Sequence, residues 1–220
     1  MIDKPAPGVA TDARPHPAGA RGARLSLQEV ADRAWKARMS PRLRAWVSQV
    51  LDKAGASRGS RRQKAKAILD EVRKKIPYVS DPVMGEFMAT PEQLLCLDKD
   101  GLCIIAADCD EFAILLAAAM LCIGIPAMIV GTSHKPPFDV PTHVLMAFQD
   151  ELEDWVRMDG TTQHPVGQTA PHQREFWVEP GKEQKDQGIG DFVGMSDKTD
   201  GDLSAPGSAL DLIYPGIRRE

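Results

Sequence analysis

The stretch Asp-Cys-Asp-Glu-Phe-Ala-Ile-Leu-Leu-Ala-Ala-Ala-Met-Leu-Cys, residues 108–122, decides the fold of this chain. The apolar run after Glu111 has almost no polar face, which is typical of a helix that is buried on every side. Gly124 follows the run at a position that fits a C-terminal cap. The sequence therefore predicts a central buried helix over Cys109–Cys122, with Cys109 in its first turn.

Cys109 is the candidate nucleophile. A helix N-terminus carries roughly half a positive charge and free N–H groups, and both favour the thiolate, which is the reactive form. Asp108 and Asp110 flank the cysteine, and acids at a helix start are good caps, but their charge opposes a thiolate. The alternative is that Cys109 is a small buried side chain without a chemical role.

The segments before this helix read as further helices. Ser26-Leu27-Gln28-Glu29 is a capping box and predicts a helix that starts near Leu27. Pro41 separates that helix from a second one, and Ser60-Arg61-Arg62-Gln63 opens a third, which Pro77 ends. Residues 78–86 read as an extended loop, and Thr90-Pro91 starts a short helix.

The segments after it read as strands, at residues 126–132, 142–148, 154–159 and 176–178. Residues 149–153 have a length that suits a hairpin loop. With Glu151 at the centre of the hairpin, His143 lies directly opposite Asp159, and Trp155 and Arg157 share the face of Asp159. A carboxylate in this place can hold one nitrogen of the imidazole and leave the other for a sulfur.

A thiol enzyme needs a polarised cysteine, a base and a group that orients the base. Cys109, His143 and Asp159 supply these three roles in that order. The Cys109 backbone N–H is a candidate oxyanion donor, Gln93 is a second one, and Trp155 is a candidate for substrate contact. The other cysteines and histidines take a structural reading: Cys96, Cys103, Cys122, His16, His134, His164 and His172.

Composition excludes several classes of protein. The 220 residues carry a net charge of −4, so global electrostatics favour neither nucleic acid nor an anionic membrane. The basic run at residues 58–66 reads as the solvated face of a helix. Without an apolar membrane span or signal-peptide core, synthesis in a cytoplasm is expected. The four cysteines lack the spacing of a disulfide scaffold or a zinc knuckle, so no metal or cofactor is expected.

The domain organisation follows from where large apolar residues occur. Residues 1–24 are a Pro/Gly-rich stretch that reads as a flexible arm, because it cannot bury enough surface to offset its ordering entropy. Residues 25–178 form the folded domain, with a helical part at 25–76 and a catalytic core at 77–178. Residues 179–220 read as an irregular C-terminal arm.

Residues 108–127 resemble the core signature of the transglutaminase-like superfamily, above all its bacterial and phage-associated members. Residues 76–82 and 90–92 are similar to the approach segment of those proteins, and Thr142-His143-Val144 and Met158-Asp159-Gly160-Thr161 resemble their histidine and aspartate motifs. The resemblance covers about residues 60–165. It implies a papain-like α+β fold, with the cysteine helix packed on an antiparallel sheet, and chemistry through a thioester acyl-enzyme without a metal.

Three functions are compatible with this reading. The first is a thiol hydrolase that cleaves peptide, isopeptide or amide bonds, with a peptide or peptidoglycan-like substrate, in a phage or prophage context. The second is a virion or tail component whose arms contact other phage structural proteins and whose fold is a scaffold with little or no activity. The third is a cross-linking acyltransferase, which would share the acyl-enzyme and use an amine as acceptor.

Overall fold

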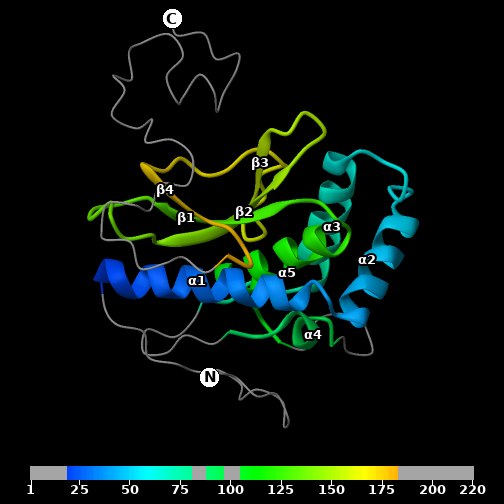
Figure 1. Cartoon of the computed structure of the whole chain (residues 1–220), viewed down its shortest axis with the longest axis horizontal. Coiled ribbons are helices and arrows are strands. Elements are labelled where there is room, and N and C mark those ends of the chain that lie inside the picture. The colour runs from blue at the N-terminus through cyan, green and yellow to red at the C-terminus, as the bar shows by residue number, and fades with distance from the viewer. Residues whose placement is uncertain (1–18, 81–87, 97–104, 183–220) are drawn as a thin grey trace, which may run out of the picture.

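The computed structural model describes residues 19–80, 88–96 and 105–182 of the chain. It contains five helices and one antiparallel sheet in these residues (Figure 1). None of the described helices combines the length and the apolar character that a membrane crossing needs. The prediction of an α+β fold is confirmed.

The helices begin at residues that satisfy their free N–H groups. Ser40 caps the second helix, and Ser60, Thr90 and Asp108 each form a capping box with the side chain three residues on. Gly124 has a φ of 77°, which places a glycine in the left-handed region just after the fifth helix. The helices are α1 Gly19–Ala37, α2 Pro41–Lys53, α3 Arg61–Lys75, α4 Pro91–Leu94 and α5 Cys109–Cys122.

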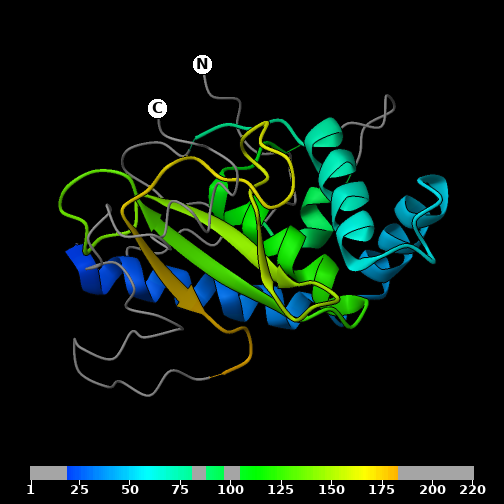
Figure 2. The ribbon, with the colours of Figure 1, turned by 90° about the horizontal axis from the view of Figure 1, so that it is seen from above.

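The sheet has the strand order β3-β2-β1-β4, and all its neighbouring strands are antiparallel. Helices α5 and α1 lie on the same face of the sheet, and α3 packs on the side of α5 (Figures 1 and 2). The strands are β1 Ala127–Ser133, β2 His143–Gln149, β3 Trp155–Met158 and β4 Arg174–Val178.

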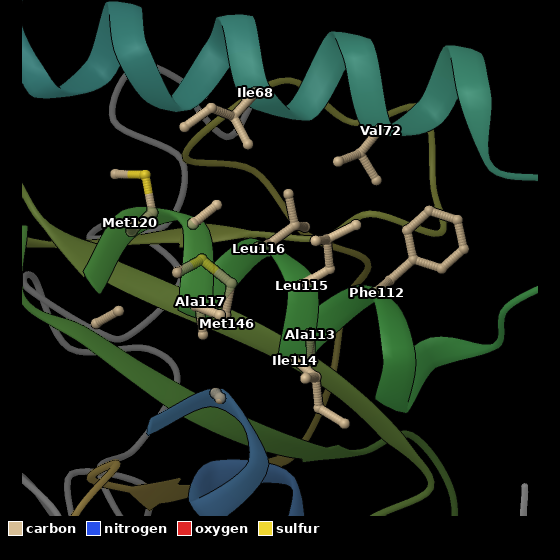
Figure 3. Packing of buried hydrophobic residues seen from close by; sticks show 14 of the residues in the cluster. Ile68, Val72, Phe112, Ala113, Ile114, Leu115, Leu116, Ala117, Met120 and Met146 are labelled. Atoms are coloured by element: carbon tan, nitrogen blue, oxygen red, sulfur yellow. The ribbon is translucent and has the colours of Figure 1, made fainter. Parts of the chain in front are cut away.

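Helix α5 is the centre of the core. Its residues from Glu111 to Met120 are all buried, because α1, α3 and the sheet surround it. Ile68 and Val72 of α3 point toward Leu115 and Leu116 of α5 (Figure 3). Burial of a side chain of this size stabilises the fold by about 1.5–3 kcal/mol, so this packing fixes where the N-terminus of α5 lies.

The start of α1 differs from the sequence prediction. The capping box at Ser26 predicts a start near Leu27, but the helix begins at Gly19 and runs through Ser26. The physical reason is that Ala20, Ala23 and their arginine neighbours are good helix formers, so the helix continues on the N-terminal side of the capping signal. The first of the two predicted arms therefore contributes its residues 19–24 to α1, whereas residues 1–18 and 183–220 lie outside the described residues.

The hairpin of β2 and β3 forms with a different register from the predicted one. Met146 pairs with Met158 and Gln149 with Trp155, so the direct pairing of His143 with Asp159 is wrong. Extending the register would bring Asp159 opposite Leu145, two residues from His143. A shift by two residues keeps every side chain on its face, because side chains alternate with a period of two, so His143 and Asp159 still meet diagonally.

Candidate active site

Cys109 is the first residue of α5, and the start of this helix is held by two carboxyl groups. Asp108 Oδ1 accepts the Asp110 N–H at 2.8 Å. The buried carboxyl of Glu111 accepts the Asp108 N–H and the Ala89 N–H, each at 2.9 Å. Burial, followed by its hydrogen bond to Asp108, raises the pKa of Glu111 to about 9. These bonds fix the helix start and the neighbouring segment before α4.

The Cys109 sulfur lies against the backbone of β2, beside His143. The Gln149 N–H donates to Pro126 O on the β1 side of the strand, and N–H groups alternate along a strand, so the Val144 N–H faces the β3 side. Strand β3 ends at Met158, which leaves the Val144 N–H beyond the end of the ladder. There it lies close enough to the Cys109 sulfur to favour the thiolate.

The sequence predicted that the helix start would favour the thiolate form of Cys109, but in the structure the effects that raise the thiol pKa prevail. Burial, the charge of Asp110 and the charge of Asp108 together raise the pKa of the thiol well above its usual value. Asp110 Oδ1 lies 3.5 Å from the sulfur. The partial positive charge of the helix start and the Val144 N–H therefore do not outweigh desolvation and the two aspartates, so the surroundings of Cys109 favour the thiol.

His143 and Asp159 form a close pair. His143 Nε2 lies 3.0 Å from Asp159 Oδ2, and because a carboxylate only accepts, Nε2 carries the hydrogen. In the described part of the chain Nδ1 of this imidazole has no hydrogen-bond partner. Burial opposes ionisation of Asp159, but the hydrogen bonds from His143 and Thr161 outweigh it and hold the carboxyl pKa below its usual value.

Three further residues position Asp159. Its Oδ1 accepts the Thr161 hydroxyl at 2.7 Å and the Thr161 N–H at 2.9 Å. Arg73 of α3 donates to the Asp159 carbonyl at 2.6 Å. Gly160 lies so close to Phe112 of α5 that an added Cβ would come within 2.5 Å of that ring. The segment around Asp159 is thus held by groups from α3, α5 and its own turn.

The sequence profile of the transglutaminase-like superfamily matches residues 45–160, which is more than half of the chain. The chain belongs to the transglutaminase-like superfamily. The transglutaminase-like match includes Cys109, His143 and Asp159, whereas α1 and β4 lie outside it. The superfamily prediction made from the cysteine, histidine and aspartate motifs is confirmed.

A crystal structure of a "putative protease" from Parabacteroides distasonis ATCC 8503 is similar to this transglutaminase-like chain, with a TM-score of 0.46 and 11% sequence identity. The similarity covers 72% of this chain and 36% of that one, so this chain spans about a third of the other's length. Among curated proteins no sequence relative is found.

The sheet face opposite α5 carries a polar network that the sequence did not reveal. Glu175 accepts hydrogen bonds from His172 Nε2 at 2.8 Å, from Arg157 at 2.5 and 2.6 Å, and from Trp177 Nε1 at 3.0 Å. His172 Nδ1 faces the Ala170 carbonyl at 3.0 Å. Both nitrogens of His172 therefore face acceptors. Burial opposes its charge, but the bond to Glu175 prevails and raises the pKa of His172.

His134 connects this network to the transglutaminase-like site. Its ring centroid lies 6.0 Å from that of His143 and 6.0 Å from that of His172. Burial opposes the charge of Glu175, but its bonds from His172 and Arg157 lower its pKa to about 2. From the sequence we predicted a structural role for His134 and His172, because their neighbours come from β1, β2 and β4 and no local pattern brings these strands together.

The two predicted binding residues lie apart from each other. Gln93 Oε1 accepts the Thr90 N–H at 2.7 Å, so this oxygen belongs to the cap of α4, and only the amide nitrogen is suited to donate to an oxyanion. Trp155 lies four residues before Asp159 on the same face of β3, about 13 Å along the strand. It packs edge-to-face on Trp177, with ring centroids 6.1 Å apart.

Two other features near the site have ordinary explanations. In the described residues, the side chains of Asp108, Cys109 and Asp110 could converge on a metal ion, but Asp108 already caps its own helix and the cluster alone indicates no metal site. A cleft of about 500 Å3 lies between α3 and the loop after Asp159. It lies behind Asp159 and is lined by Arg62, Lys66, Arg73, Gln163 and Val166 among others.

Proposed function

We propose that this chain is a cysteine peptidase or amidase in which Cys109 is the nucleophile, His143 the general base and Asp159 the group that orients the base. One observation carries the proposal. His143 Nε2 lies 3.0 Å from Asp159 Oδ2, and the next residue of β2, Val144, has its N–H near enough to the Cys109 sulfur to favour the thiolate. In this proposal, three segments distant in sequence supply the thiol, the imidazole and the carboxylate at one end of β2.

The reaction follows from the unequal surroundings of the two imidazole nitrogens. Nε2 of His143 donates to Asp159, which leaves Nδ1 to take the thiol proton as the sulfur attacks an amide carbonyl. The Cys109 backbone N–H is the proposed donor to the oxyanion, with the Gln93 amide as a weaker candidate. His143 then protonates the leaving amine, the C–N bond breaks and a thioester forms. Water, activated by His143, hydrolyses this thioester and releases the acid.

The raised pKa of Cys109 bears on how the reaction starts. A raised thiol pKa means that His143 has to remove the proton before or as the sulfur attacks. The two aspartates beside the sulfur favour the second function, a scaffold with little activity, because they work against a thiolate. The His143–Asp159 pair favours the enzyme, because a scaffold has no need of an oriented imidazole at the sulfur.

Peptide or isopeptide bonds are the proposed targets. The peptides of peptidoglycan and a phage or prophage setting are narrower hypotheses that come from the resemblance of residues 108–127. Transfer to an amine, the third function, would use the same thioester.

Incubation with a library of fluorogenic peptides and with purified peptidoglycan tests the proposal. The wild-type protein should release products, whereas Cys109→Ala and His143→Ala should lose the activity at least about a thousandfold. Cys122→Ala, which changes a half-buried cysteine at the other end of α5, is the matched control and should keep it. Full activity of Cys109→Ala would contradict the proposal. Incorporation of a labelled primary amine would show transfer instead of hydrolysis.

A further inference from the structure

The segment after α3 runs beside the residues that lead into Cys109. The Val79 N–H donates to Ala107 O at 2.9 Å, and the Ala107 N–H donates to Pro77 O at 3.1 Å. These bonds form a single parallel bridge between Tyr78 and Ala107. Since Pro77 and Val79 direct their polar groups toward Ala107, the alternation of an extended chain turns the N–H and C=O of Tyr78 the opposite way.

The outward side of this segment is here called the Tyr78 edge and consists of the Tyr78 backbone with the side chains of Tyr78 and Val79; it has no partner strand among the described residues. In the described part of the chain the backbone of Tyr78 makes no hydrogen bond. The side chains of Tyr78 and Val79 are 50% and 53% exposed, although both are large and apolar. An exposed backbone edge with apolar side chains is a feature that proteins usually cover or interrupt, because another chain can pair with it.

The Tyr78 edge lies at the candidate active site. The ring of Tyr78 lies 6.4 Å from that of Phe112, and Phe112 follows Cys109 by three residues, so it shares the face of α5 with the sulfur. Phe112 also contacts Gly160, the neighbour of Asp159. The exposed tyrosine ring therefore flanks the region between the sulfur and the carboxylate.

We propose that the Tyr78 edge is a substrate subsite that binds an extended peptide, and this inference rests on the proposed function. The substrate main chain pairs with the N–H and C=O of Tyr78, and an apolar side chain of the substrate lies against the tyrosine ring. A peptide is the occupant because it offers repeated amides for the edge and the carbonyl that a thiol attacks.

The position of the subsite along the substrate follows from strand spacing. Two spacings of about 4.8 Å separate a chain paired with Tyr78 from the segment that leads to Cys109, and a peptide advances about 3.3 Å per residue. A substrate therefore needs about three residues or more to reach from Tyr78 to the carbonyl that Cys109 attacks.

Labelling of Cys109 by peptide fluoromethyl ketones tests the subsite. The probes are acetyl-Ala, acetyl-Val-Ala and acetyl-Phe-Val-Ala fluoromethyl ketone, with iodoacetamide as a reagent that has no peptide. Each added contact at the edge should raise the second-order labelling rate, about tenfold in total between one and three residues. Tyr78→Ala should reduce this gain to less than about threefold and leave iodoacetamide labelling unchanged, whereas Tyr78→Phe should keep the gain.

The backbone part of the subsite has its own test. N-methylation of the phenylalanine in the tripeptide probe removes one donor and should lower labelling of the wild-type protein about tenfold. Leu152→Ala, at a turn residue that is 80% exposed, is the control and should behave as wild type. If all three probes label Cys109 at equal rates, and this labelling still depends on His143, the subsite is overturned and the proposed function stands. Failure of all probes and of iodoacetamide to label Cys109 would overturn the proposed function itself.

Discussion

At the scale of single residues, the chemistry of this site depends on which charges lie near the sulfur. The Val144 N–H and the helix start favour a thiolate, whereas burial and the two aspartates oppose it more strongly. In our proposal His143 changes this balance, because no group among the described residues bonds its Nδ1 and its Nε2 is held by Asp159. The reactivity of Cys109 should therefore respond to its acidic neighbours and to His143.

Asp110→Asn should make Cys109 more reactive. Its carboxylate lies 3.5 Å from the sulfur and raises the thiol pKa, so its neutral analogue should lower that pKa. Alkylation by iodoacetamide at pH 7.5 should become about three- to tenfold faster. At a pH below the thiol pKa, lowering that pKa by one unit raises the thiolate fraction about tenfold. Asp154→Asn in an exposed turn is the matched control. An unchanged alkylation rate at Cys109 would show that the Asp110 charge is screened from the sulfur.

Thr161→Val should weaken the hold on Asp159. The variant loses the hydroxyl donor at 2.7 Å and keeps the backbone N–H, so the pKa of Asp159 should rise toward its ordinary value. A carboxyl with a depressed folded pKa stabilises the protein above its unfolded pKa, near 3.9, and loses this contribution as pH falls through the folded pKa. Acid unfolding should therefore begin at a higher pH than in wild type, and Thr161→Ser should restore it. Circular dichroism between pH 2 and pH 6 measures this.

At the scale of elements, the site is built where α5, β2 and the turn after β3 meet. The turn is fixed on one side by Arg73 of α3 and on the other by close packing of Gly160 on Phe112. Because Phe112 and Cys109 both belong to α5, this contact fixes the position of α5 relative to the turn that carries Asp159.

Gly160→Ala should disturb this contact. The added Cβ would come within 2.5 Å of a Phe112 ring carbon and 2.9 Å of its Cβ, so the turn must shift. We expect a loss of about 1–3 kcal/mol in unfolding free energy, together with lower activity. Thermal melts and peptide hydrolysis measure both effects. The double variant with Phe112→Leu makes room for the methyl group and should recover part of the loss, and strict additivity of the two changes would contradict the packing argument.

The sequence predicted most elements but not how they pair. Caps at Ser60, Thr90 and Asp108 locate helix starts correctly because their bonds are local. The register of β2 and β3 was wrong by two residues because loop length alone does not specify it. The network around Glu175 depends on groups that meet only after the sheet forms, so local patterns could not show it. For Cys109 the sequence showed the opposing charge of Asp108 and Asp110, but not the burial that raises the thiol pKa most.

At the scale of the whole molecule, the superfamily match is smaller than the folded unit. It spans residues 45–160, yet α1 packs on α5, β1 and β4, and β4 pairs with β1. The boundaries of the domain at residues 25 and 178 stay a prediction, and α1 begins before residue 25, at Gly19.

A chain of residues 19–182 should therefore fold like the full protein, with a thermal midpoint within about 4 °C, because this range contains all the described elements. A chain of residues 45–160 should not give a cooperative transition, since it lacks α1 and β4 and exposes the buried side chains of α5 and β1. Calorimetry and circular dichroism measure the outcome, and cooperative melting of the shorter chain would show that α1 and β4 are dispensable.

The pH dependence of iodoacetamide alkylation at Cys109, followed by peptide mapping in the wild-type protein and in His143→Ala, tests the central claim most directly. If His143 takes the thiol proton, His143→Ala should slow alkylation of Cys109 at pH 7 at least about tenfold. The alkylation rate of the variant should then rise only at high pH, where the thiol ionises without help from a base. Alkylation of Cys122 in the same samples should not change. Identical rates and pH profiles at Cys109 in the two proteins would contradict the claim that this thiol and this imidazole act together.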